Sequence, residues 1–149
     1  MKNILLPEPG TYIIIIRIDN VRNLEVGRIG NHYIKKGYYF YVGSAFGPGG
    51  IRARISRHLK KDKTRRWHID YLRDAGSISG TLIYYGAMKK ECIWASNLAL
   101  SRIISMPIKK FGSSDCACES HLFYSNRKIT GKMLKSILKE TGDIHVFKE

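Results

Sequence analysis

The run TYIIIIRID at residues 11–19 constrains the fold of this chain more than any other segment. It is rich in β-branched and aromatic side chains and begins directly after a Pro-Gly pair, and both features are typical of a strand. Its apolar part, Tyr12 to Ile16, lies between Gly10 and Arg17 and has the length of a buried strand. We therefore expect a protein built around a sheet.

Short predicted strands and helices follow this first strand. Between residues 24 and 43, glycines divide the chain into apolar pieces that predict hairpins. After the glycine-rich loop at 47–50, Ile51, Ile55 and Leu59 recur at helical spacing among basic residues, which predicts a basic amphipathic helix at 51–61. The remaining patterns predict helices at about 66–74, 90–104 and 130–140, strands at 81–87 and 121–125, and an ordered loop at 105–120.

Apolar spacing also predicts which side chains of the last two helices enter the core. Thr130 precedes the last helix and is expected to cap its N-terminus. The predicted core positions are Ile93, Leu100, Ile103 and Ile104 in the helix at 90–104, and Met133, Leu134, Ile137 and Leu138 in the helix at 130–140.

The length of the chain indicates one domain. A chain of 149 residues with 44% apolar composition can bury one core and is too short for two ordinary domains. Residues 1–149 are therefore predicted to form a single domain, with a core at about 10–125 and a C-terminal helical extension at about 126–149. The expected fold class is α/β (α+β), with a small, mostly antiparallel central sheet flanked by helices.

The charge of the chain predicts a polyanionic partner. The formal net charge is +14, from 26 Lys and Arg against 12 Asp and Glu. Nucleic acid is the first candidate, because neutralising phosphates releases counterions whatever the base sequence; an acidic membrane surface or plain solubility are alternatives. A membrane span needs about 20 apolar residues, and the sequence shows neither such a stretch nor a secretory signal. With an odd number of cysteines, three, we expect a cytoplasmic protein without a disulfide framework.

Two tyrosines lie beside glycines in similar settings. The GTY run at 10–12 begins the first strand, and the YVG run at 41–43 ends the strand before the basic helix. If these strands pair, both phenols approach one edge of the sheet, and Arg54 and His58, four positions apart, share the helix face turned toward them. Phosphodiester hydrolysis needs a base for water, a cation for the transition state and a metal for the leaving oxygen, so this set fits that reaction.

These segments resemble the signature of the GIY-YIG nuclease superfamily. The runs GTY, YVGSA and GGIRARISRH carry the resemblance, while RRWHIDYL, KKEC and FGSSDCACESHLF are similar to one branch whose members stand alone or are fused to an endonuclease III-type DNA glycosylase. Together they cover residues 10 to about 124. The resemblance implies a GIY-YIG-like core and a metal-dependent DNA endonuclease that uses Mg²⁺ or Mn²⁺. It also implies a role in DNA repair, with incision at abasic or damaged sites and a repair glycosylase as a partner.

The resemblance implies a role for each motif residue. Tyr12 matches the tyrosine that activates the attacking water, and Tyr41 matches the one that positions this water or its proton relay. Arg54 matches the arginine that stabilises charge on the scissile phosphate. His58 matches a position where relatives carry histidine or tyrosine, and Glu91 is the acid available as metal ligand on the third helix.

The chain departs from better-known relatives at two places. Aligning their glutamate helix on the SNL run puts the metal ligand at Ala95, one helical turn after Glu91; Glu91 can still reach the same metal, because residues four apart share a helix face. The interval between Tyr12 and Tyr41 is also longer than in many relatives. Its extra residues, including 27–37, are predicted to form an added hairpin.

Basic and polar residues around this constellation are predicted to bind the DNA backbone. Most come from the basic helix and from the segment at 63–66 that follows it. For His68, packing beside Trp67 and Ile69 is an equal alternative to a phosphate contact. The predicted DNA-binding residues are Ser44, Arg52, Arg57, Lys60, Lys61, Arg65, Arg66 and His68.

Cys116, Cys118 and His121 form a Cys-x-Cys-x-x-His pattern. These residue types bind zinc, but a structural zinc site needs four ligands and usually has wider cysteine spacing. Asp115 is the only further donor nearby in the sequence. A packed loop that fixes the end of the sheet is therefore the favoured interpretation, with DNA contacts as an alternative.

Two other functions stay open on the sequence alone. One is a non-catalytic nucleic-acid-binding module that keeps the fold and has lost the metal ligand, which the alanine at position 95 motivates. The other is an abasic-site lyase, in which a lysine forms a Schiff base with the opened sugar.

Overall fold

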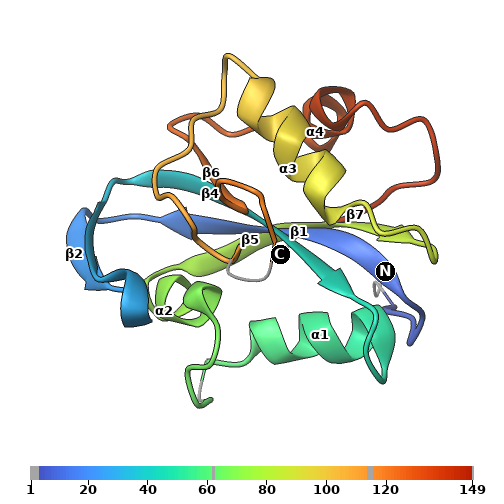
Figure 1. The fold of residues 1–149 in the computed structure, drawn as a ribbon, viewed down its shortest axis with the longest axis horizontal. Helices are drawn as coiled ribbons and strands as arrows, with labels where there is room; N and C mark the ends of the chain where they lie inside the picture. The colour runs from blue at the N-terminus through green and yellow to red at the C-terminus, as the bar shows by residue number, and fades with distance from the viewer. Residues whose placement is uncertain (1–3, 62, 114–115, 149) are drawn as a thin grey trace.

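The computed structural model describes residues 4–61, 63–113 and 116–148. Its centre is an antiparallel sheet with the strand order β6-β4-β1-β5-β7 (Figure 1). The apolar run at residues 12–16 lies in β1, the middle strand. The strands are β1 (Gly10–Ile18), β4 (Gly37–Ala45), β5 (Ser77–Tyr85), β6 (Leu122–Ser125) and β7 (His145–Lys148).

A second, two-stranded sheet lies between β1 and β4 in the sequence. β2 (Arg22–Glu25) pairs antiparallel with β3 (Asn31–Ile34), and the short 3-10 helix η1 (Gly27–Ile29) connects them. This is the added hairpin that the long interval between the two motif tyrosines predicts.

Helices cover both faces of the central sheet (Figure 1). α1 (Gly50–Leu59) and α2 (His68–Ala75) share a core cluster with alternate residues of β1, among them Tyr12 and Ile14. α3 (Glu91–Leu100) and α4 (Gly131–Leu138) share the opposite cluster with Ile13. Successive residues of a strand point to opposite faces, so the continuous apolar run of β1 serves both clusters. The predicted fold class is confirmed: a central antiparallel sheet flanked by helices.

The predicted core face of α3 is wrong at three positions. The helix ends at Leu100, and Ile93, Leu100 and Ile103 are more than half exposed, while Ile104 alone of the four is buried. The buried residues of α3 are Trp94, Ala95 and Leu98. Most positions of this helix are apolar, so its periodicity does not single out one face.

The C-terminal segment is only partly helical. α4 begins after Thr130, whose hydroxyl accepts a hydrogen bond from the Met133 amide at 3.1 Å, so the predicted cap is confirmed. Leu134 and Leu138 are buried as predicted, whereas Met133 is 42% exposed. The chain then returns as β7, which pairs with β5, and this strand was absent from the predicted helical extension.

Among the described residues, no helix combines the length and the apolar character needed to cross a membrane.

Candidate active site

The two motif tyrosines come together through the pairing of β1 with β4. Tyr12 lies opposite Gly43, and Tyr41 lies opposite Ile14, so both phenols project from the sheet face that α1 covers. β6 pairs with β4 only as far as Tyr41. The last residues of β4 therefore lie at an edge of the sheet, and the predicted pairing of the two motif strands is confirmed.

Two glycines make room for these rings. A Cβ atom at Gly43 would overlap the Tyr12 ring, lying 2.9 Å from its Cε1 atom. Gly112, in the loop that follows α3, has a φ of +69°, and a Cβ there would lie 2.7 Å from Cε1 of Tyr41. Each tyrosine ring thus packs directly against the backbone of a glycine, where a larger residue would clash with the ring.

A cavity of about 320 Å³ lies beside this end of β4. Four of the five predicted catalytic and metal-binding residues line it, although they come from β1, β4, α1 and α3. Ser44 of β4 and Trp67, which precedes α2, also contribute to the wall. The four predicted catalytic and metal-binding residues are Tyr12, Tyr41, Arg54 and Glu91.

His58 lies behind Tyr12 rather than in the cavity wall. It is 1% exposed, and its Nε2 atom lies 2.8 Å from the Tyr12 hydroxyl. Burial lowers the pKa of His58 to about 3, with Arg54, Arg57 and Lys63 adding to the effect and Asp70 opposing it. The imidazole is therefore neutral at physiological pH and can exchange a proton with the phenol.

Both phenols are held in their neutral form. Burial raises the pKa of Tyr12 well above its ordinary value, and the neighbouring Tyr41 and Glu91 raise it further, while Arg54 lowers it. Burial likewise raises the pKa of Tyr41, with Glu91 contributing. A free phenolate is therefore scarce in this cavity near neutral pH.

Arg54 is positioned by contacts on two sides. Its Nη1 donates to the carbonyl oxygen of Ser44 at 3.1 Å, and its Cζ lies 4.7 Å from the centre of the Trp67 ring. Trp67 also contacts His58, with ring centres 5.6 Å apart. This residue was predicted only as a packing partner for His68, and the structure adds that it orients the cationic side of the cavity.

Glu91 supplies the carboxylate of the cavity. Burial alone would raise its pKa, but His121, Ser44 and Arg54 nearby lower it, so the side chain is ionised at neutral pH. Nδ1 of His121 lies 2.8 Å from its Oε1 atom. Ala95 is 3% exposed and belongs to the core between α3 and the sheet. Of the two candidate positions for the metal ligand, 91 and 95, only Glu91 lies in the cavity wall.

Arg57, one of the predicted DNA contacts, makes internal contacts instead. Its guanidinium donates to both carboxylate oxygens of Asp70, each at 2.9 Å, and its Cζ lies 4.0 Å from the centre of the Trp67 ring. Asp70 also accepts hydrogen bonds from the amides of Arg66 and Trp67. This pair fixes the start of α2 against α1 and thereby holds Trp67 beneath Arg54.

His68 is likewise occupied within the protein. Its Nδ1 accepts a hydrogen bond from the Gly112 amide at 2.8 Å, and its ring packs edge-on against Phe111. The packing alternative for His68 is thus the one that the contacts favour. Through Gly112, His68 holds the loop after α3 against Tyr41.

The other predicted DNA contacts differ in their surroundings. Ser44 is partly exposed in the cavity wall. Arg65 is exposed but pairs with Asp74 at 2.6 Å. The remaining four are exposed on α1 or on the segment that follows it: Arg52, Lys60, Lys61 and Arg66.

One family model matches most of the chain. The model described as Domain of unknown function DUF123 matches residues 11–142. The chain belongs to the DUF123 family. The matched DUF123 region contains every residue that lines the cavity as well as α4, while no curated protein and no solved structure matches the chain.

Proposed function

We propose that this DUF123 chain is a metal-dependent DNA endonuclease of the GIY-YIG type. The observation that carries the proposal is the convergence of Tyr12, Tyr41, Arg54 and Glu91 on one cavity from four separate elements. A phenol, a guanidinium and a carboxylate around one cavity can activate water, bind a phosphate and hold a divalent cation. The net charge of +14 supports a polyanionic substrate.

Tyr12 activates the attacking water in this proposal. A neutral phenol can take a proton from water only if it gives up its own at the same time, so an acceptor must lie on its far side. Nε2 of the neutral His58, 2.8 Å from the hydroxyl, is that acceptor. The pair therefore forms a proton relay that avoids a free phenolate, and His58 acts from behind the cavity wall.

Arg54 and Tyr41 act on the phosphate and the water. The Arg54 guanidinium faces the cavity and is held by Ser44 and Trp67, so it is preorganised to stabilise charge on the scissile phosphate. Tyr41 keeps its proton, because burial raises its pKa, and its hydroxyl can orient the water by hydrogen bonding.

Glu91 is the residue that would hold Mg²⁺ or Mn²⁺. The fit rests on an ionised carboxylate at a cavity with room for water and a phosphate oxygen, and Mg²⁺ is commonly held by one or two carboxylates with several waters. When bound, the ion would supply stabilisation of charge on the leaving oxygen.

The structure offers less support to the two alternatives. A lyase needs an amine next to the sugar, and no lysine lines this cavity among the described residues. The non-catalytic module rests on the alanine at position 95, whereas Glu91 supplies a carboxylate to the cavity wall. A role in repair, with incision at abasic or damaged sites beside a repair glycosylase, remains part of the proposal through the family resemblance alone.

A panel of DNA substrates tests the proposal. Intact, nicked, abasic, branched and single-stranded DNA is incubated with the protein in Mg²⁺, in Mn²⁺ and in EDTA. We expect cleavage with a divalent metal, and we expect Arg54→Ala and Glu91→Gln to lower its rate by orders of magnitude while DNA binding persists. Tight DNA binding without cleavage in any metal would support the non-catalytic module. A covalent adduct trapped with borohydride would support the lyase.

A further inference from the structure

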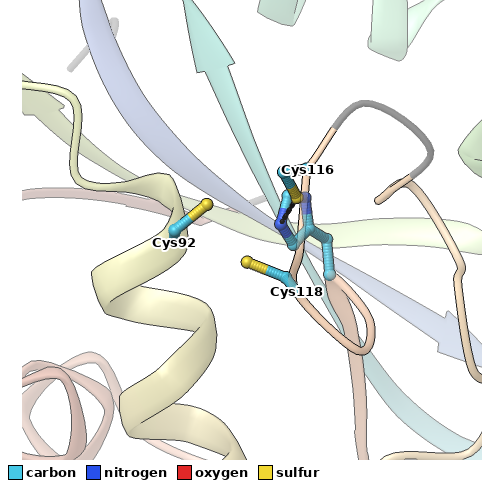
Figure 2. Close-up of side chains that lie close together, drawn as sticks. Cys92, Cys116 and Cys118 are labelled. Carbon is cyan, nitrogen blue, oxygen red and sulfur yellow. Dashed lines mark hydrogen bonds between the residues drawn. The ribbon is translucent and has the colours of Figure 1, made fainter.

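All three cysteines of the chain gather around His121 at one place, although one of them is distant in sequence. Cys92 lies in the first turn of α3, and Cys116 and Cys118 lie on the loop before β6 (Figure 2). One ligand atom from each of the four residues lies within 4.8 Å of all the others. We propose that Cys92, Cys116, Cys118 and His121 bind a structural zinc ion.

A structural zinc site needs four ligands, and the sequence pattern at 116–121 supplies only three of them. Three cysteine sulfurs and one imidazole nitrogen form a known ligand set for tetrahedral structural zinc. Asp115, the nearby fourth donor in the sequence, lies outside the described residues. Cys92 takes that place from α3, so the close spacing of Cys116 and Cys118 no longer argues against a zinc site.

The spacing of the four atoms is close to that of a bound site. Zinc–sulfur bonds of about 2.3 Å in a tetrahedron place two sulfur atoms about 3.8 Å apart. The widest separation in the cluster, at most 4.8 Å, therefore needs a contraction of about 1 Å. Cys92 is exposed, while Cys116 and Cys118 are partly exposed, so small side-chain rotations suffice.

The orientation of His121 gives independent support. Its Nε2 lies 3.4 Å from the sulfur of Cys116, and its Nδ1 lies 2.8 Å from Oε1 of Glu91. Histidines that bind a metal through one ring nitrogen usually direct the N–H of the other to a carboxylate, a backbone carbonyl or water. His121 is 2% exposed, and its backbone is held by hydrogen bonds with Val42 and Phe111. One nitrogen thus lies near a sulfur and the other near a carboxylate oxygen.

The zinc would join α3 to the loop that closes the cavity. That loop contributes Gly112, Cys116 and His121 to the cavity wall, and α3 contributes Glu91. One bond from Cys92 of α3 and three bonds from the loop would fix the loop against α3 and, through His121, orient the Glu91 carboxylate. The inference concerns metal binding alone and does not depend on the proposed cleavage of DNA.

The competing state of this cluster is a disulfide between two of the three thiols, which would leave His121 unligated.

The test uses the full chain, purified under reducing conditions and dialysed against buffer without zinc. We expect about one zinc ion per chain by elemental analysis. Cys92→Ser and Cys118→Ser should lose this zinc, whereas His145→Gln, at an exposed histidine on β7, should retain it. Glu91→Ala should keep the site but lower its zinc affinity by about 10- to 100-fold.

A second measurement keeps the test decisive if the cysteine variants do not fold. Co²⁺ replaces zinc in the unaltered chain, and the visible and ultraviolet bands of tetrahedral cobalt with thiolate ligands are recorded. Such bands, abolished by added Zn²⁺, would support the site. A folded chain that binds neither ion under reducing conditions, or one whose cysteines form a disulfide, would overturn the inference. None of these readouts involves DNA, so this failure is distinct from failure of the nuclease proposal.

Discussion

At the scale of single residues, His58 is a buried histidine with only one of its two ring nitrogens paired. Its Nε2 meets the Tyr12 hydroxyl, but its Nδ1 has no hydrogen-bond partner within the described part of the chain. A buried polar atom without a partner costs about 1–3 kcal/mol, so a core chosen for stability alone would avoid it. This cost is consistent with a residue retained to exchange a proton with Tyr12.

The low pKa of His58 predicts a pH dependence of stability. The folded-state value of about 3 lies below the ordinary value of 6.5, so as pH falls below 6.5 the unfolded chain takes up a proton that the folded chain does not. The stabilisation is present above 6.5 and is lost as pH falls toward 3. When the pH is lowered from about 7 to about 5, the unfolding free energy of the parent should fall by about 2 kcal/mol more than that of His58→Gln. Urea denaturation at both pH values measures this, and equal losses would refute it.

Gly43 allows a second residue-scale prediction. Gly43→Ala places a Cβ against the Tyr12 ring, so the phenol must move. We expect a loss of about 1–3 kcal/mol in unfolding free energy and about a 100-fold loss of cleavage, because catalytic groups tolerate little displacement. Gly142→Ala is the control, since a Cβ there has its nearest neighbour 4.0 Å away. Unchanged cleavage in Gly43→Ala would show that the Tyr12 position is not critical.

At the scale of elements, strands and helices with a one-sided pattern were predictable from sequence. α1 has its apolar stripe at Ile51 and Ile55, and both are buried as the spacing requires. α3 carries apolar residues on most faces, so only tertiary packing decides that Trp94 and Leu98 enter the core. The cavity residues were predictable because GTY and YVG mark the ends of strands that pair, whereas the contact between Cys92 and the loop depends on how α3 docks.

The junction of α1 and α2 depends on the pair between Arg57 and Asp70. Asp70 is 1% exposed at its side chain and Arg57 24% exposed, so the pair is largely shielded from solvent. Asp70→Asn should lower the unfolding free energy by roughly 2–4 kcal/mol, because the largely shielded guanidinium of Arg57 loses its counter-charge. Asp74→Asn removes the exposed partner of Arg65 and should cost less than about 1 kcal/mol. Chemical denaturation compares them, and equal effects would contradict a special role for this pair.

At the scale of the whole molecule, one sheet brings distant segments to one edge. The sequence predicts the central strands. It does not predict β7, because these four residues have no neighbouring turn signal and no alternation of apolar and polar side chains long enough to indicate a strand. β7 becomes a strand by pairing with β5, and this long-range pairing has no local signal. The exposed basic residues on and after α1 lie on the sheet face opposite α4.

This arrangement predicts a one-sided DNA interface. Replacing Lys60 and Lys61 together by glutamine should weaken DNA binding and reduce the slope of log K against log salt by about 2, as two phosphate contacts are lost. The matched control replaces the exposed Lys128 and Lys132, next to and within α4, by glutamine. Fluorescence anisotropy over a range of salt concentrations gives both slopes. An equal change in the two double variants would show that charge alone, without a defined face, governs binding.

The proposed cleavage of DNA depends on activation of water by Tyr12. The most direct measurement is the single-turnover cleavage rate of Tyr12→Phe on a DNA that the parent cuts, with affinity measured in parallel. Tyr33→Phe, at a tyrosine that is 63% exposed, is the control. We predict that Tyr12→Phe cuts about 100- to 10,000-fold more slowly with nearly unchanged affinity, while Tyr33→Phe matches the parent. Cleavage by Tyr12→Phe at the rate of the parent would show that Tyr12 does not activate the water.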